Sequence, residues 1–366
     1  MTTSLRNPQF WRDFDWFLLL VTLLLSAIGL VEIYSSTLNM ATASYFERQL
    51  VWVAVGIVAL FVIASLDYHL LAEHIPIVYG GAVLVLAAVL LFGRTVSGAQ
   101  SWFQIGSLGV QPSEFTKLVV IVALARYFSG IQKRYLTWQQ ILIALAICGI
   151  PMLLVGLQPD LGTALTFVPI LAFGLFVRGV RPAAIAAGAV IAVLLLIPAW
   201  STLQDYQKDR ILTFVQPETD PLGRGYQVIQ SKIAIGAGGF WGKGLFQGSQ
   251  NQLGFLPTRH TDFIFSVVAE EMGFVGVCLT LALLMALLTR ALALAMKPRD
   301  TLGTFIVIGV VGMFVFHVLV NVGMVIGFMP ITGIPLPFLS YGGSSVLTAF
   351  AGVGLIISVK RCRYVN

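Results

Sequence analysis

The sequence predicts an all-α, polytopic integral membrane protein with about ten transmembrane helices. Of its 366 residues, 58% are hydrophobic and only 10% are charged, and the mean hydropathy is +0.91. Soluble domains carry about 25% charged residues. Apolar stretches of about 17 to 25 residues, long enough to cross the hydrocarbon core of a bilayer, recur along the chain. These observations exclude an ordinary soluble domain, a disordered chain and a disulfide scaffold.

The predicted spans follow one another along the chain, which we treat as a single membrane domain of residues 1–366. They lie near Trp16–Tyr34, Leu50–Leu66, Ile75–Phe92, Phe115–Phe128, Gln140–Val155, Leu161–Val177, Ala183–Trp200, Val267–Leu288, Thr304–Phe328 and Ser345–Val359. The first span is too long for a cleaved signal peptide and is predicted to remain as an anchor. The fourth is short, but Pro112 and Ser113 are expected to cap and lengthen it.

The distribution of basic residues predicts the orientation, because short cytoplasmic loops are enriched in Lys and Arg. With the N-terminus inside, the short outside loops hold only Arg48 and Arg94. The inside set is Arg6, Arg12, Arg126, Lys133, Arg134, Arg178, Arg181, Arg290, Lys297, Arg299, Lys360, Arg361 and Arg363. Both termini are therefore predicted to be cytoplasmic. The net charge of +6 then reflects topology, and no nucleic-acid partner is expected.

The segment of residues 201–262 is the one long loop between predicted spans, and this orientation makes it extracytoplasmic. We expect short helices that lie on, or dip into, the outer membrane surface. Its glycine-rich stretch Gly236–Gly244 does not match a P-loop, because Ala237 and Gly244 occupy the motif's first glycine and Ser/Thr positions. Closely spaced glycines allow backbone N–H groups to approach an anion. Contact with a pyrophosphate and packing at the membrane surface are equal alternatives for this stretch.

The segment Met329–Phe338 is uncharged and contains three prolines. Prolines at this density prevent regular helix, yet the segment is too apolar for water. Irregular backbone at membrane depth is tolerated only against protein or a wet cavity. We therefore predict a re-entrant loop beside a cavity.

Glu114 and Lys117 are ionisable residues inside the fourth predicted span, and such residues are functional candidates. Their spacing of three places them on one face of the helix. One interpretation is a mutually neutralising pair that fixes helix packing. The other is that the pair lines a polar cavity and Lys117 meets an anionic substrate group; the two are compatible.

Asp160 and Asp262 stand where two spans are expected to begin on the outside. An aspartate at this position is most often a helix N-cap. The alternative for Asp262 is a general base, since partial desolvation raises the pKa of a carboxylate towards neutrality. Glu270 and Glu271 lie about 12 to 14 Å further along a regular helix, so structural pairing is expected for them.

His260 and His317 are isolated, and no second His or Cys stands at ligand spacing, so a zinc site is not predicted. The three cysteines, Cys148, Cys278 and Cys362, form no CxxC motif. The residues alone leave two alternatives open, which are a transporter and an enzyme that acts on a lipid-linked anion.

The ordered motifs of the chain resemble those of the SEDS family, the shape, elongation, division and sporulation proteins. The blocks that carry the resemblance are Gln111–Glu114 with Lys117, Gln158–Ala164, Gln230–Ser231, Ala234–Gly236, Gly242–Gly244, Leu256–Pro257, His260–Phe265 with Glu270–Glu271, Asn321–Met324 and Pro330–Ser345. The sequence of the motif Thr332–Phe338 is more similar to the elongation branch of the family than to the division branch.

This resemblance implies a ten-span peptidoglycan glycosyltransferase that polymerises lipid II on the outer face of the bacterial cytoplasmic (inner) membrane. It also implies a class B penicillin-binding transpeptidase as partner and a divalent cation, Mg²⁺ or Mn²⁺, as cofactor. The family's catalytic aspartate falls on Asp262. No metal-ligand spacing is visible in the sequence itself.

The implied mechanism makes Asp262 the general base and needs cations near the departing pyrophosphate. The candidates for this charge are Lys117, Arg210 and Lys243. Glu114, Asp160 and Ser344 complete the predicted substrate-binding set. Two alternatives remain, a lipid II flippase and a non-catalytic scaffold that recruits the transpeptidase.

Overall fold

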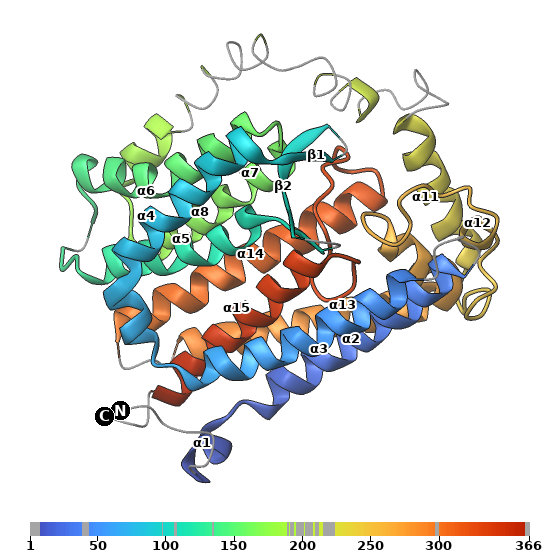
Figure 1. Ribbon diagram of the computed structural model, residues 1–366, viewed down its shortest axis with the longest axis horizontal. Coiled ribbons are helices and arrows are strands. Elements are labelled where there is room, and N and C mark those ends of the chain that lie inside the picture. Colours follow the sequence, from blue (N-terminus) through green and yellow to red (C-terminus); the bar gives the residue numbers. More distant parts are fainter. Residues whose placement is uncertain are drawn as a thin grey trace.

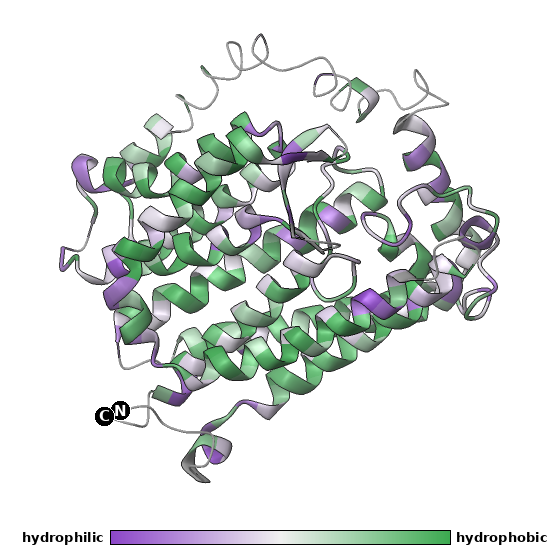
Figure 2. Cartoon of the chain, in the orientation of Figure 1, coloured by the Kyte–Doolittle hydropathy of each residue, from purple (hydrophilic) through white to green (hydrophobic). Residues whose placement is uncertain are grey.

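The computed structural model describes residues 8–38, 44–96, 98–105, 108–133, 135–188, 224–296 and 300–362, with isolated positions between 190 and 214. Its long helices run side by side as a bundle (Figure 1). Hydrophobic residues cover these helices along their lengths, and many of the hydrophilic residues lie at the helix ends and in the connections (Figure 2).

The elements follow the chain in a simple order. The helices are α1 (Pro8–Asp13), α2 (Trp16–Thr37), α3 (Ser44–Ser65), α4 (Tyr68–Phe92), α5 (Pro112–Ser129), α6 (Trp138–Leu157), α7 (Leu161–Leu165), α8 (Phe167–Arg178), α11 (Arg224–Gly238), α12 (Ser249–Gln252), α13 (Ile264–Ala295), α14 (Thr301–Val325) and α15 (Gly343–Cys362). The strands are β1 (Arg94–Val96), β2 (Ala99–Ile105) and β3 (Leu108–Val110).

Within the described residues, eight helical segments are long and apolar enough to cross a membrane, and each matches a predicted span. Helix α5 matches a ninth prediction, although its three charged residues Glu114, Lys117 and Arg126 set it apart by composition. It begins at Pro112, as expected, but its N-cap position is Gln111, which makes no side-chain capping bond. The predicted span Ala183–Trp200 falls largely outside the described residues.

A small antiparallel sheet between α4 and α5 adds to the predicted all-α fold. Strand β2 pairs with β1 on one side and β3 on the other. Gly98 turns the chain between the first two strands with φ of 89°. The strands are too short and too mixed in hydropathy to produce a clear sequence signal, so the sequence analysis missed them.

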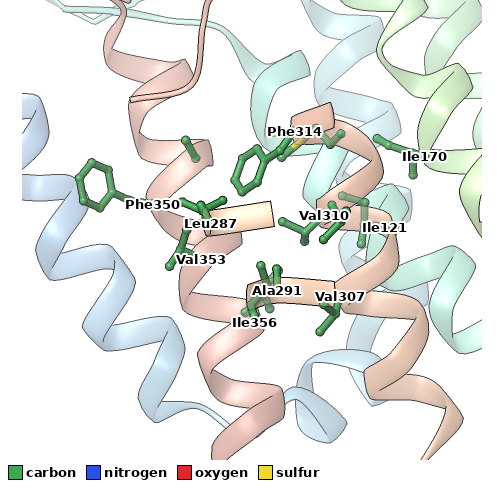
Figure 3. Close-up of a cluster of buried hydrophobic side chains, with 14 of the residues drawn as sticks. Ile121, Ile170, Leu287, Ala291, Val307, Val310, Phe314, Phe350, Val353 and Ile356 are labelled. Atoms are coloured by element: carbon green, nitrogen blue, oxygen red, sulfur yellow. The ribbon is translucent and has the colours of Figure 1, made fainter. Parts of the chain in front are cut away.

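The buried centre of the bundle is built by α14 and α15. In these two helices 72% and 78% of the apolar window is buried, against 17% in α4 at the periphery. Side chains of α5, α13, α14 and α15 point towards one another in this core, with Phe314 and Val310 among them (Figure 3). The peripheral helices therefore present their apolar faces outwards, as expected for contact with lipid.

The glycine-rich stretch after α11 packs against a break in α13. Gly273 inside α13 has φ of 65° and ψ of −161°, which interrupts the helix. The backbone N–H groups of Lys243 and Gly244 donate to the carbonyls of Glu270 and Glu271, both at 3.0 Å. A Cβ at Gly242 would collide with the Glu271 carbonyl. These glycines are thus used for close packing against α13, a role distinct from both anion contact and packing at the membrane surface.

Ion pairs and hydrogen bonds of Asp15, Arg290, Lys360 and Asp300 stabilise one end of the bundle. We call this end the basic end. The Asp15 carboxylate caps α2 and accepts hydrogen bonds from Arg290 at 2.8 Å and Lys360 at 2.9 Å. Burial by itself would raise the pKa of Asp15, but the hydrogen bonds from Arg290 and Lys360 outweigh it and lower the pKa. Asp300 accepts from Tyr68 and lies 2.7 Å from the His69 ring.

Candidate active site

A cavity of about 480 Å³ lies at the opposite end of the bundle from the basic end. It is surrounded by the N-terminal ends of α5, α7 and α15, the turn before α13, strand β2 and the proline-rich loop. The positive ends of these helix dipoles favour an anion. The loop residues Thr332, Gly333 and Pro335 line the cavity without helical structure, which confirms the predicted irregular loop beside a cavity.

Asp262 lies in the turn before α13 and lines this cavity, with its side chain half-buried. The N-cap position of α13 is Phe263, which makes no side-chain capping hydrogen bond, and Asp262 precedes this position. The N-cap interpretation of Asp262 is therefore wrong. The Asn321 amide donates to the Asp262 carbonyl at 3.0 Å and so fixes the turn. Gly333 brings the proline-rich loop beside the carboxylate, since a Cβ there would lie 3.8 Å from Asp262 Oδ2.

Asp160 also lines the cavity, but its carboxylate is engaged locally. It accepts hydrogen bonds from the Thr163 backbone N–H at 3.1 Å and the Thr163 hydroxyl at 2.9 Å. The Gln111 amide donates to it at 2.8 Å. The N-cap interpretation of Asp160 is confirmed, here for α7. Ser344, another lining residue, accepts the Gln111 backbone N–H at 3.0 Å, which joins α15 to the start of α5.

Glu114 and Lys117 form a buried ion pair beneath the cavity, with 2.7 Å between Lys117 Nζ and Glu114 Oε1. Glu114 lines the cavity, whereas Lys117 is fully buried and lines only a small void below it. Lys117 Nζ also lies 3.3 Å from His317 Nε2, and His317 Nδ1 lies 3.0 Å from the Pro335 carbonyl. The pair thus packs helices and also places a carboxylate at the cavity surface.

The remaining predicted substrate-binding residues are elsewhere. Lys243 is not among the residues that line the cavity. Its ammonium donates to Glu270 at 2.8 Å and to the Ser249 hydroxyl at 2.6 Å. Glu270 and Glu271 are both buried and hydrogen-bonded, which confirms the expected structural pairing. Arg210 lies outside the described residues.

Among the lining residues that the sequence analysis did not select as site residues are Arg48, Gln111, His260 and Tyr341. Burial, with a smaller contribution from the charge of Arg259, lowers the pKa of His260, so its imidazole is neutral at pH 7. Burial raises the pKa of Tyr341, although a side-chain hydrogen bond with Arg48 opposes this. The sequence carried a signal for two of these residues, Arg48 and His260. Arg48 is one of two basic residues in the short outside loops, and His260 stands two residues before Asp262.

The carboxylates of Glu114, Asp160 and Asp262 line one cavity but do not form a metal cluster. Among the described residues no group of three or more His, Cys, Asp or Glu side chains could hold a metal ion. Mg²⁺ is often bound by one or two carboxylates together with substrate phosphates. The described residues therefore do not make a protein-only cation site, and no step below is assigned to a metal.

The chain is a polytopic membrane protein of the FtsW/RodA/SpoVE family. The family model, described as "cell cycle protein", matches residues 15–365, which covers nearly the whole chain. This confirms the family resemblance that the sequence motifs indicated.

Named relatives and solved structures agree with this assignment. The chain is 38% identical to the peptidoglycan glycosyltransferase MrdB of Escherichia coli (strain K12), over 99% of this chain and 98% of that protein. It is 35% identical to the peptidoglycan glycosyltransferase RodA of Treponema pallidum (strain Nichols), over 95% and 98%. The crystal structure of the Thermus thermophilus rod shape determining protein RodA superposes with a TM-score of 0.73 at 33% identity, covering 97% of this chain and 99% of that one.

A chain from a structure of a peptidoglycan synthase complex, described as coordinating polymerization and crosslinking, superposes with a TM-score of 0.82. It is 38% identical and covers 96% of this chain and 99% of its own. At this identity and coverage the fold is that of the RodA-like members of the family.

Proposed function

We propose that this protein is a peptidoglycan glycosyltransferase that polymerises lipid II at the cavity around Asp262. The single observation that supports this site most strongly is Asp262 itself. Its carboxylate belongs to a turn rather than to a helix cap, and it borders a cavity of about 480 Å³ at one end of the bundle. Relatives that share 35% and 38% identity over nearly the full chain are named peptidoglycan glycosyltransferases.

In the proposed reaction, Asp262 accepts the proton of the GlcNAc 4-hydroxyl of the incoming lipid II. The freed oxygen attacks the anomeric carbon of the lipid-linked MurNAc at the end of the growing strand. The new glycosidic bond forms as the bond from that carbon to the pyrophosphate breaks, with inversion, and undecaprenyl pyrophosphate leaves. A positioned carboxylate base of this kind contributes about 10²- to 10⁴-fold to a rate.

The leaving pyrophosphate needs positive potential, and the cavity supplies two sources of it. The N-terminal ends of α5 and α15 converge there, and helix N-termini bind phosphate groups. Arg48 is the basic side chain among the described lining residues. Lys117 acts from below by neutralising Glu114, so that this carboxylate does not repel the substrate. Asp160 and Ser344 shape the wall through Gln111.

Lys243, held by Glu270, and Arg210 remain substrate-binding predictions. A requirement for Mg²⁺ or Mn²⁺ also remains a prediction, in which the substrate's pyrophosphate supplies most of the oxygen ligands. Chelation with EDTA and titration with each ion test it.

We also propose the cellular setting. The chain lies in the bacterial cytoplasmic membrane with both termini inside, residues 201–262 outside and Asp262 near the outer surface. All the described basic residues of the basic end then face the cytoplasm, as the positive-inside rule requires. The sequence of the motif Thr332–Phe338 favours a role in elongation rather than division. A class B penicillin-binding transpeptidase is the proposed partner, supported by the synthase complex that superposes on this chain.

The test is polymerisation of labelled lipid II by the purified protein, with and without the transpeptidase and with added Mn²⁺. The Asp262→Asn variant is the matched comparison, because it keeps the size of the side chain and removes the base. We expect glycan ladders from the wild type and none from the variant. Equal ladders from both proteins would contradict the role of Asp262. Lipid II scrambling in vesicles without any ladder would favour the flippase, and neither activity would favour the scaffold.

A further inference from the structure

A second cavity, of about 570 Å³, lies between α4, α5 and α6, which are neighbours in the bundle (Figure 1). Its walls are mainly apolar and aromatic, with one charged side chain. The lining residues from which we infer its ligand are Ile75 and Tyr79 of α4, Ala123, Arg126 and Tyr127 of α5, and Ile147 of α6.

This cavity is separate from the candidate active site. The two share no lining residue. Arg126 and Glu114 are twelve residues apart on α5, which corresponds to about 18 Å along a helix. Arg126 donates to the backbone near the start of α4, and that segment adjoins the basic end. The second cavity therefore lies towards the basic end of the bundle, whereas the cavity that Asp262 lines lies at the other end.

A proline in α4 explains the position of Arg126. Pro76 has no N–H, so the carbonyl of Ala72, four residues earlier, loses its usual helical donor. Arg126 Nη1 replaces that donor, with hydrogen bonds of 2.5 Å to the Ala72 carbonyl and 2.6 Å to the Glu73 carbonyl. These bonds hold the guanidinium on the cavity wall. Nη1 supplies only two of the five guanidinium donors.

Within the part of the chain that the structure describes, Arg126 has no counter-ion, and it is the charged residue that lines this apolar cavity. Lys117 pairs with Glu114, Lys243 with Glu270, and Arg290 and Lys360 with Asp15. No described carboxylate lies within ion-pair distance of Arg126, whose recorded hydrogen bonds go to backbone carbonyls. The hydroxyls of Tyr79 and Tyr127 also donate to backbone carbonyls, of Ile147 and Gln140, so their hydrogen-bonding groups are used.

We propose that this cavity binds an anionic phospholipid, with the phosphate on Arg126 and an acyl chain between α4, α5 and α6. Arg126 is a cation without a described counter-ion on the wall of an apolar cavity of ligand size. A phospholipid in the surrounding membrane complements both features, because its phosphate is anionic and its acyl chains are apolar. An arginine binds phosphate through paired N–H donors. The inference does not depend on the proposed glycosyltransferase activity.

The test is native mass spectrometry of the purified full-length protein with phosphatidylglycerol, phosphatidylcholine or undecaprenyl phosphate added in separate samples. We expect one retained phosphatidylglycerol. Arg126→Gln should weaken its binding roughly fivefold, since a basic residue near a membrane surface contributes about this much. Ala123→Phe, which fills the cavity, should remove the bound lipid with Arg126 still present, so it keeps the test decisive if R126Q does not fold.

Two matched controls accompany these variants. Arg290→Gln removes another arginine near the basic end, which pairs with Asp15 and does not line the cavity. Leu142→Phe adds bulk on the exposed face of α6. Both should retain the lipid. Equal retention of phosphatidylcholine, equal weakening by R290Q, or preference for undecaprenyl phosphate would each overturn the proposal.

Discussion

At the basic end of the bundle, the charged side chains neutralise one another. Asp15 accepts from Arg290 and Lys360, and Asp300 accepts from Tyr68. At the other end, Asp262 and Glu114 border a cavity of about 480 Å³. Helices α13 and α15 reach from one end to the other, since Arg290 and Lys360 lie near their C-terminal ends and both helices begin at the cavity. This difference indicates that charged side chains paired with one another stabilise helix packing, whereas charged side chains that border a cavity can contact a substrate.

The Glu114–Lys117 pair lies between these two cases, so its disruption is expected to have the largest effect on stability. Lys117→Met leaves Glu114 buried without a partner, which costs about 3 to 5 kcal/mol. The melting temperature of the purified protein should fall accordingly.

The double variant Glu114→Gln with Lys117→Met distinguishes packing from catalysis, because it removes both charges. It should recover most of the melting temperature and remain poorly active if the pair also serves the cavity. Full recovery of both the melting temperature and the activity would show that the pair serves helix packing alone.

Asp15→Asn tests the basic end. We expect a loss of about 2 kcal/mol, less than for a fully buried pair, because Arg290 is 40% exposed at its side chain. Since the pKa of Asp15 is lowered in the folded state, its contribution is complete above the unfolded pKa of about 4. It is lost as pH falls through the lower folded pKa. The difference in melting temperature between the wild type and D15N should therefore narrow as the pH is lowered from 7 to below 4; a constant gap would contradict this.

Gly162 of α7 tests how closely the cavity wall is packed. A Cβ there would collide with the Thr332 carbonyl of the proline-rich loop, so Gly162→Ala should cost about 1 to 3 kcal/mol and reduce polymerisation. Gly149→Ala on α6 is the matched control, since a Cβ at that position meets nothing within 4 Å. Similar melting temperatures and activities for the two variants would show that the loop moves aside without consequence.

The sequence predicted features that depend on local patterns. Apolar runs predicted the long helices, and three prolines predicted the irregular loop of residues 329–338, because both signals are contained within one segment. Asp160 was correctly interpreted as an N-cap for the same reason. The family motifs then selected Asp262, whose position in a turn the residues alone did not predict.

Features that depend on distant contacts were missed. The ion pair of Lys243 with Glu270 joins positions 27 apart, next to the break in α13 at Gly273, and the substrate contact of Lys243 stays a prediction. Arg48 reaches the cavity from α3, far along the chain from Asp262. A single sequence carries no local pattern for either contact.

The central claim is that the cavity end carries catalysis and the basic end carries stability. It is tested most directly by measuring lipid II polymerisation and melting temperature for Asp262→Asn and Asp15→Asn side by side. We predict that D262N keeps the wild-type melting temperature and loses about 10²-fold or more of the rate, while D15N melts lower and still polymerises below its melting temperature. A D262N protein that polymerises lipid II at the wild-type rate would contradict the account.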